Sequence, residues 1–334
     1  MGRYLGGVSL GDWRRLVRVG SVAAAWIRAR VEATVYGVDL SSRLSGPAGD
    51  PGLFGPDSMV WRVHSNLLGM LTGGFAALVL QSLHPLAMAG VDQHSTYRQD
   101  PVRRLNQTAG FIAVTSFGSC PQARAAIARI RRRHGSIRGT APDGRTYAAS
   151  DPALLTWVHV AEVSCFLAGY QAYGGSWLTD VQCDRYFREM AVIAEELGAT
   201  SVPASSGEVR SYLNSVCHEL ASSDASLDMV RFLRGLGQDA LERTVVRILM
   251  NAAVRILPVW APPQLDLKYP SPVFDLLHRA AAHALGAVLR YGCEPSPILE
   301  TARARVNTPH ASGCVDHSAR IPDPFFRETF LSGK

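Results

Sequence analysis

The sequence predicts an all-α fold built as a single large helical domain. Three observations carry this prediction. A run from Leu67 to Leu83 is apolar and almost free of charge, several segments open with a capping residue followed by proline, and convincing strands are absent. A chain of 334 residues can bury about three quarters of the surface that its unfolded form exposes, so a deep apolar pocket is compatible with its size.

The predicted helices cover most of the chain. The first spans residues 9–37, and a loop rich in glycine and proline follows at 41–57. Asp57 or Ser58 then caps one long helix from about Met59 to Ala89. Further helices are expected at about 101–118, 121–134, 151–173, 179–197, 205–222, 226–256, 272–291 and 297–306, with a short hairpin or loop at 140–149.

The apolar run within 59–89 is nearly long enough to span a bilayer. The other interpretation is a central helix that is buried on all sides. Arg62 and His64 lie near its start, and Gln81 and His84 lie near its end. Polar groups this close to the run favour a buried helix in a large core.

The N-terminal segment resembles a twin-arginine signal only faintly. Arg14 and Arg15 precede the short apolar run Gly20–Ile27, but Arg28 and Arg30 interrupt it and no convincing cleavage site follows. We therefore expect an amphipathic first helix and a cytoplasmic protein.

The charge balance is basic, at +6, and the excess is arginine, since Lys268 and Lys334 are the only lysines. No recognition motif with interleaved aromatics accompanies it, so nucleic acid is not an expected partner. Buried arginines that bind an anion, such as a cofactor carrying carboxylates, fit the composition equally well. The six cysteines form no CxxC pair, which excludes a zinc ribbon and a thioredoxin-type site.

Common catalytic signatures are missing. The sequence has no GxSxG elbow, no Walker loop, no HExxH and no GxGxxG between a strand and a helix. This removes the commonest hydrolases, nucleotide enzymes and zinc proteases. Histidines and arginines on helices that face an apolar interior remain.

His134 ends a strongly basic helix whose small apolar residues share one face. Steps of three and four residues place Ala123, Ala126, Ile127, Ile130 and His134 on that face. A neutral imidazole in an apolar pocket is a good ligand for haem iron. The alternative is a histidine that caps the last carbonyl groups of its helix.

Arg104 and Thr108 are four residues apart and so lie on one helix face. An arginine can bind a carboxylate with two hydrogen bonds, and a threonine hydroxyl can bind a polar ligand. A haem propionate would suit the arginine. The alternative is an ordinary arginine that pairs with an aspartate in the core.

Further histidines flank the apolar run. His84 ends it, His94 follows in the next loop, and His159 lies on a later helix three residues before Glu162, which could hold one of its ring nitrogens. Each alone is typical of a satisfied polar core residue. Together with His134 they raise the chance of a metal or haem pocket.

Several segments, in this order, resemble the family that contains the latex clearing proteins and the fungal oxygenase MpaB. The resemblance covers about residues 50–290, and no single motif within it is specific. The segments are Gly55–His64, Gln81–Pro85, Gly90–His94, Asp100–Thr108, His134–Gly139, Gly144–Tyr147 and Asp151–His159.

The resemblance implies a helical fold with a globin-like core that holds one haem b. The family's iron-binding histidine follows the basic helix and corresponds to His134, and its essential arginine and threonine correspond to Arg104 and Thr108. The latex clearing proteins cleave double bonds of polyisoprene with dioxygen, and MpaB-type members cleave a prenyl chain. We expect three segments: an N-terminal helical extension and loop (1–50), a haem-binding oxygenase-like domain (51–306) and an irregular C-terminal tail (307–334).

Two departures from the family put polyisoprene cleavage in doubt. The residue before the threonine is a lysine in the rubber-cleaving protein and is Gln107 here. The family's upstream glutamate would fall near Met88, and the nearest acidic residue is Asp92. Gln107 is expected to line the distal side of the haem with Thr108.

The function expected from this resemblance is a haem b-dependent oxygenase or oxidase. It would act on a small hydrophobic or cyclic metabolite with dioxygen or peroxide, with an electron donor as a further candidate partner. His84 and His159 are expected to assist at the cofactor. One alternative is a haem- or lipid-binding carrier without turnover. Another is a membrane-surface protein that uses the arginines of the first helix, a contact we do not expect.

Overall fold

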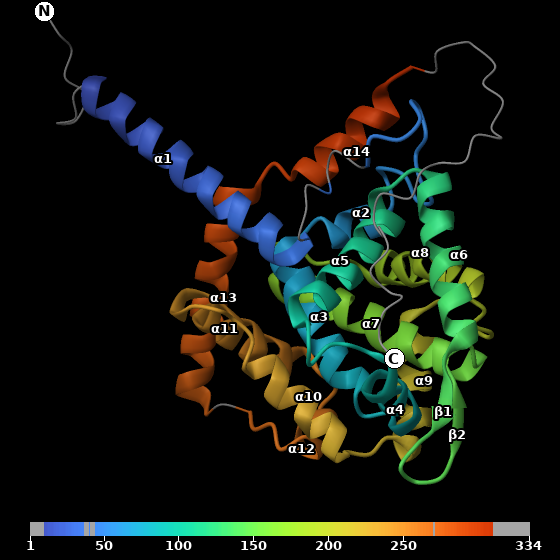
Figure 1. Ribbon diagram of the computed structural model, residues 1–334. Helices are drawn as coiled ribbons and strands as arrows, with labels where there is room; N and C mark the ends of the chain where they lie inside the picture. Colours follow the sequence, from blue (N-terminus) through green and yellow to red (C-terminus); the bar gives the residue numbers. More distant parts are fainter. Residues whose placement is uncertain (1–9, 37–39, 41–43, 270, 310–334) are drawn as a thin grey trace, which may run out of the picture.

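The all-α prediction is confirmed by a computed structural model (Figure 1), which describes residues 10–36, 40, 44–269 and 271–309. The first half of the described chain forms α1 (Leu10–Val31), a π-helical turn (Glu32–Tyr36), α2 (Met59–His64), α3 (Leu67–Gln81), α4 (Pro85–His94), α5 (Pro101–Phe117), α6 (Cys120–Ser136) and α7 (Pro152–Tyr173). The second half forms α8 (Asp180–Leu197), α9 (Ser206–Val216), a 3₁₀ turn (Cys217–Glu219), α10 (Asp224–Arg234), α11 (Ala240–Ile256), α12 (Ala261–Gln264), α13 (Pro272–Cys293) and α14 (Pro297–Asn307).

Helices α3 and α7 lie at the centre of the molecule and pack backbone to backbone (Figure 1). Glycines allow this approach. A Cβ atom on Gly169 of α7 would lie 2.3 Å from the carbonyl oxygen of Gly69, and one on Gly73 of α3 would lie 2.7 Å from the carbonyl oxygen of Cys165. No residue of α3 is exposed, so the interpretation of the apolar run as a buried central helix is confirmed.

The single helix expected over 59–89 is wrong, because this segment folds as α2, α3 and α4. The side chain of Asn66 accepts a hydrogen bond from the Gly69 N–H at 2.7 Å and starts α3. His84 caps α4, Pro85 occupies its first turn, and α4 bends away from α3 by 104°. Capping side chains compete with the helix for backbone hydrogen bonds, which ends a helix even within an apolar run.

Only α7 among the described helices is by itself long and apolar enough to cross a membrane, and the bent pair α3 and α4 qualifies only if it is taken as one span. Two thirds of the apolar stretch of α7 is buried inside the protein. A core helix of a large domain has these properties.

One more helix differs from the sequence prediction, and of the hairpin or loop expected at 140–149 the hairpin is confirmed. The helix expected over 226–256 is divided into α10 and α11, because Gly237 adopts a φ of +107° and Asp239 caps α11. The segment around 140–149 forms an antiparallel hairpin of β1 (Arg138–Thr140) and β2 (Thr146–Ala148). α14 reaches Asn307, and residues 310–334 of the expected irregular tail lie outside the described residues.

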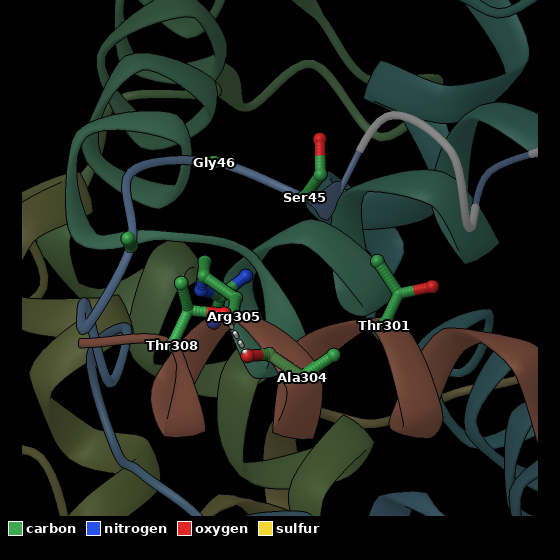
Figure 2. Close-up of a pocket in the computed structure, with 7 residues that line it drawn as sticks. Ser45, Gly46, Thr301, Ala304, Arg305 and Thr308 are labelled. Atoms are coloured by element: carbon green, nitrogen blue, oxygen red, sulfur yellow. Dashed lines mark hydrogen bonds between the residues drawn. The ribbon is translucent and has the colours of Figure 1, made fainter.

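Arg305 of α14 joins three segments of the backbone. Its guanidinium donates to the carbonyl oxygens of Leu44 at 2.7 Å, Asp50 at 2.9 Å and Gly118 at 3.3 Å, and its side chain is almost fully buried. Figure 2 shows Arg305 lying between α14 and the loop that contains Gly46, beside a shallow pocket. Three of its five N–H donors are therefore used by backbone carbonyl groups of the protein.

Replacing Arg305 by methionine is expected to lower the free energy of unfolding by about 3 kcal/mol, because three carbonyl groups would lose their donor in a site that excludes water. Urea unfolding measures the change. Arg303→Met, at an exposed position of the same helix, is the matched control and should stay within about 0.5 kcal/mol of the wild type. Equal stabilities for the two variants would contradict the prediction.

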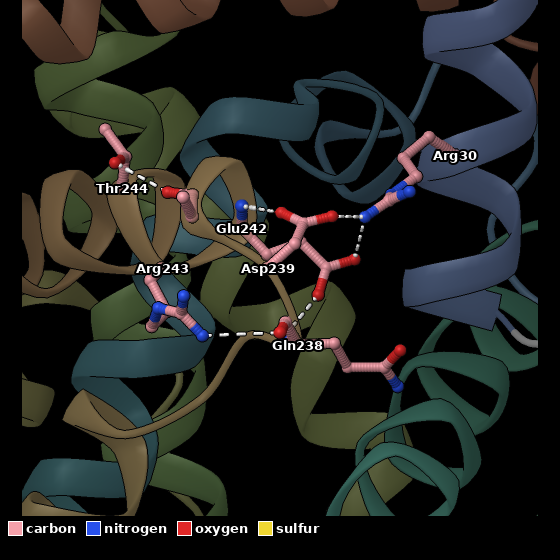
Figure 3. A network of polar contacts seen from close by, with 7 residues as sticks. Arg30, Gln238, Asp239, Glu242, Arg243 and Thr244 are labelled. Carbon is pink, nitrogen blue, oxygen red and sulfur yellow. Dashed lines mark hydrogen bonds and ion pairs between the residues drawn. The ribbon is translucent and has the colours of Figure 1, made fainter.

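Helix α1 is attached to the body by its two last arginines. Arg30 pairs with Asp239 and Glu242 at the start of α11 (Figure 3), with 2.8 Å between the Arg30 Nη2 and Glu242 Oε1 atoms. Arg28 donates from Nε to the carbonyl oxygen of Gly292 at 3.2 Å. These contacts tie α1 to α11 and α13.

Candidate functional site

Arg104 and Thr108 meet on one face of α5, as their spacing predicts. Asp100 caps this helix by accepting from the Arg103 N–H at 3.1 Å, which fixes where the helical phase begins. Arg104 Nη1 donates to Thr108 Oγ1, and Thr108 Oγ1 donates to the carbonyl oxygen of Arg104 at 3.3 Å. The two side chains are therefore held as one unit beside Gln107, which is half-buried.

Among the described residues, the desolvated cation of Arg104 has no ion-pair partner. Within the part of the chain that the structure describes, no carboxylate lies within 4.0 Å of its guanidinium. Burial lowers its pKa, the charge of Arg133 lowers it further, and Glu162 raises it. The ordinary alternative, an arginine paired with a core aspartate, is not what the structure shows. A buried unpaired guanidinium is suited to binding an anion.

His134 lies at the end of α6, and the predicted apolar stripe of this helix is confirmed. Ala123, Ala126 and Ile127 are buried, and the stripe ends at His134, which is half-buried. The Nδ1 atom of His134 is buried and has no hydrogen-bond partner. Burial, then the charges of Arg104 and Arg133, lower the pKa of His134, so its ring is neutral near pH 7.

His159 and Glu162 lie one turn apart on α7. The Nε2 atom of His159 is buried without a partner, and burial lowers the pKa of this histidine to about 4. Burial also raises the pKa of Glu162 to about 7, while Arg104 lowers it. The structure describes no hydrogen bond between Glu162 and His159, which the sequence had left open. The charge that acts on Glu162 belongs to Arg104 instead.

These groups converge on one region between α5, the end of α6 and α7. Arg104 acts electrostatically on His134 and on Glu162, and Arg133 acts on both Arg104 and His134. Arg104, His134 and Glu162 each keep some accessible surface although desolvation dominates the shift in pKa of each. The three side chains are therefore largely covered by the protein without being fully buried.

The structure does not bring His84 and His94 to this region. His84 caps α4, its ring lies 5.8 Å from the ring of Trp157, and its Nε2 atom lies 3.9 Å from Glu219 Oε2. Trp157 and His159 are two residues apart on α7 and so point to different sides of that helix. His94 lies at the end of α4 rather than in a loop, and its Nε2 atom contacts the carbonyl oxygen of Arg138 at 3.2 Å.

A buried polar network next to the site was missed from the sequence. His64 of α2 lies between Ser116 of α5, at 2.6 Å from Nδ1 to Oγ, and Tyr186 of α8, at 3.0 Å from Nε2 to Oη. Burial lowers the pKa of His64 to about 3, and Glu162 is among the charges that raise the pKa of Tyr186. Three separate helices supply this network, so no local spacing in the sequence signals it.

The described residues contain no group of three or more His, Cys, Asp or Glu side chains placed to hold a metal ion. A cofactor that brings most of the ligands of its metal needs no such group from the protein. Haem leaves only the axial positions to the protein. One neutral histidine, with an arginine for the carboxylates of the cofactor, fits that requirement.

The buried histidines and Glu162 predict opposite responses of stability to pH. Below about pH 6.5 an unfolded histidine binds a proton, whereas His64 and His159 stay neutral in the folded protein until pH falls to about 3 and 4. Each therefore lowers the free energy of unfolding as pH falls, by about 1.4 kcal/mol per pH unit. Glu162 opposes them. Its folded pKa, about 7, lies above the ordinary value of 4.5, so its contribution is largest at low pH and is lost as pH rises through 7.

Glu162→Gln is therefore expected to steepen the loss of stability between pH 6.5 and pH 4.5. Because Glu162 offsets about one histidine, the slope of the variant should exceed that of the wild type by about 1.4 kcal/mol per pH unit. Urea unfolding across this range measures both slopes. Glu195→Gln, at an exposed glutamate of α8, serves as the control. Identical slopes for Glu162→Gln and the wild type would show that Glu162 titrates normally.

Comparison with known proteins identifies the family. A search of the curated proteins and a search of the solved structures gave no match. The family model described as "ER-bound oxygenase mpaB/B'/Rubber oxygenase, catalytic domain" matches residues 61–290, which is more than half of the chain. Arg104, His134 and Glu162 all lie within the matched range, and α1 and α14 lie outside it. The chain therefore belongs to the MpaB and rubber oxygenase family, and its general activity is that of an oxygenase.

Proposed function

We propose that the protein is a haem b-dependent oxygenase or oxidase that acts on a small hydrophobic or cyclic metabolite with dioxygen or peroxide. The observation that supports this proposal most is that two polar groups of the same region each lack a binding partner. His134 presents a buried ring nitrogen without a partner, and Arg104 presents a desolvated cation without an ion pair nearby in the described structure. A planar cofactor that carries a metal and carboxylates satisfies both.

His134 would hold the haem iron. A histidine binds a metal only when a ring nitrogen is unprotonated, and burial together with the charges of Arg104 and Arg133 keeps this ring neutral. Its position at the end of the basic helix α6 leaves the charged side chains Arg131 and Arg132 in solvent. When bound, haem b supplies a redox-active iron that activates dioxygen or peroxide.

Arg104 would bind a propionate of the cofactor, and it also positions Thr108. Because Arg104 donates to Thr108 Oγ1 while this hydroxyl donates to the backbone, the threonine has a fixed orientation before any ligand arrives. Gln107 and Thr108 would contact the oxidant or the substrate, as a half-buried amide and hydroxyl on the same turn of α5.

Glu162 is the group in this region suited to moving a proton. Its pKa of about 7 leaves it partly protonated near neutral pH, so it can both donate and accept. The charge of Arg104 restrains that pKa from rising further. Met88 is buried where the family resemblance places a glutamate, so an acid–base role falls to a different helix in this chain.

Oxygen uptake tests the proposed activity. The haem-loaded protein is reduced with a chemical donor and mixed with a panel of small hydrophobic and cyclic compounds, with a polyisoprene sample alongside. We expect substrate-dependent oxygen consumption with at least one small compound and none with the polymer. Turnover of the polymer alone would contradict the substrate class, and haem binding without any uptake would favour a carrier.

A further inference from the structure

The outer face of α13 is apolar along the whole helix. The inner face packs on the protein through Ala282, Gly286 and Leu289. At 100° per residue, the positions opposite to these are Val273, Leu276, Leu277, Ala280, Ala284, Ala287, Val288 and Tyr291, all of which are exposed. A surface helix normally carries polar side chains on its outer face. An apolar outer face therefore indicates a surface that binds a membrane or another molecule.

The apolar residues are large at the N-terminal half of α13. Val273, Phe274, Leu276 and Leu277 are each between 58% and 71% exposed. Figure 1 shows α13 at the edge of the molecule, with α1 across one of its ends. A helix of 22 residues offers a stripe about 33 Å long.

The charges of α13 lie along one edge of this stripe and are basic. Arg279 and Arg290 are eleven residues apart, which is about three helical turns and places them in one line, and both are exposed. The only acidic residue of the helix is Asp275, which lies toward the inner face and pairs with Arg255. Glu294 follows the helix as its C-cap residue.

We propose that this outer face of α13 docks on an anionic lipid surface, with the apolar stripe entering the interface and Arg279 and Arg290 contacting the lipid phosphates. An amphipathic helix with a basic edge lies in the plane of a membrane in this way. Two of the arginines that the sequence suggested for such a contact have other partners. Arg28 and Arg30 are engaged with α13 and α11.

Charge complementarity favours lipid over a second copy of the chain. A second α13 would bring another basic edge, and the outer face has no acidic side chain to pair with it. Anionic head groups supply that partner at every point along the edge. Lys268, just before the helix, is exposed and adds to the positive charge, although Asp266 beside it is also exposed.

Flotation with vesicles tests the apolar part of this contact. The full-length protein is mixed at moderate salt with vesicles of phosphatidylcholine alone or of phosphatidylcholine with phosphatidylglycerol. We expect the wild type to float with the anionic vesicles and the double variant Phe274→Ser, Leu277→Ser to bind them at least about tenfold more weakly. Val181→Ser, at a valine of α8 that is more exposed than either of these residues, should float as the wild type does.

The charged edge has its own test. Arg279→Glu with Arg290→Glu should remove the preference for anionic vesicles, whereas Arg210→Glu on the exposed side of α9 should keep it. A wild type that stays at the bottom with anionic vesicles would overturn the proposal, as would α13 variants that float normally. A wild-type dimer that the Phe274→Ser, Leu277→Ser variant converts to a monomer would also overturn it, because the face would then be an interface between copies.

Discussion

Replacing Arg104 by methionine is expected to lower kcat/KM by about a hundredfold or more and, in the protein without cofactor, to leave stability unchanged or raise it. Removing a preorganised charged donor from a catalytic site typically costs a factor of about a hundred to a thousand. The free protein, in contrast, has no described carboxylate in an ion pair with this cation, so its removal relieves a desolvation cost. Opposite effects on activity and stability distinguish a ligand-binding arginine from a structural one.

Arg104→Met also has an expected signature in the pH profile. Arg104 lowers the pKa of Glu162, so its loss should shift any activity limb that Glu162 controls to higher pH. Arg104→Lys keeps the positive charge but lacks the planar guanidinium that forms two parallel hydrogen bonds. Its pH profile should therefore resemble that of the wild type, while its kcat/KM stays low. Arg132→Met, on the exposed side of α6, is the control. Wild-type kcat/KM in Arg104→Met would contradict the proposed role.

Gly169→Ala is expected to lower the free energy of unfolding by about 3 kcal/mol, at the upper end of the range for overpacking a core. The added Cβ atom would lie 2.3 Å from the carbonyl oxygen of Gly69 and 3.1 Å from the Gly73 amide nitrogen. Both neighbours are backbone atoms of α3, so no side chain can rotate away. The central pair of helices would have to separate, which would also disturb the positions of His159 and Glu162 on α7.

Gly207→Ala provides the matched control for this substitution. Gly207 lies in a helix, α9, but a Cβ atom there would have nothing within 4 Å. The helical preference of alanine should then make the variant neutral or more stable by up to about 1 kcal/mol. Urea unfolding of both variants separates the clash from the general effect of losing a glycine, and similar stabilities for both would contradict tight packing of α3 on α7.

The sequence predicts the helices best where their ends carry strong chemical signals. The caps at Asp100, Asp151 and Thr179 and the glycine end at Gly198 are all confirmed. Gly235, Gly237 and Asp239 indicate the break between α10 and α11 in the sequence. The regular spacing of apolar residues over 226–256 nevertheless led to the prediction of one continuous helix. The breaks around α3 were harder to predict, because single polar residues interrupt an otherwise apolar run.

The candidate site was predictable only where its residues share one helix. The Arg104–Thr108 contact and the stripe that ends at His134 follow from helical spacing and are confirmed as contacts and faces. The action of Arg104 on Glu162, and the distance of His84 from both, depend on how α4, α5 and α7 pack. Spacing along one chain carries no information about these tertiary contacts.

The ultraviolet–visible spectrum of the purified protein, with the His134→Ala variant measured in parallel, tests the central claim most directly. We predict a Soret band in the wild type, as purified or after haem is added, and its loss or strong displacement in the variant. The variant should fold normally, because the Nδ1 atom of His134 makes no hydrogen bond that would be lost. A wild type that stays colourless in the presence of haem, or a His134→Ala variant with an unchanged band, would contradict the account.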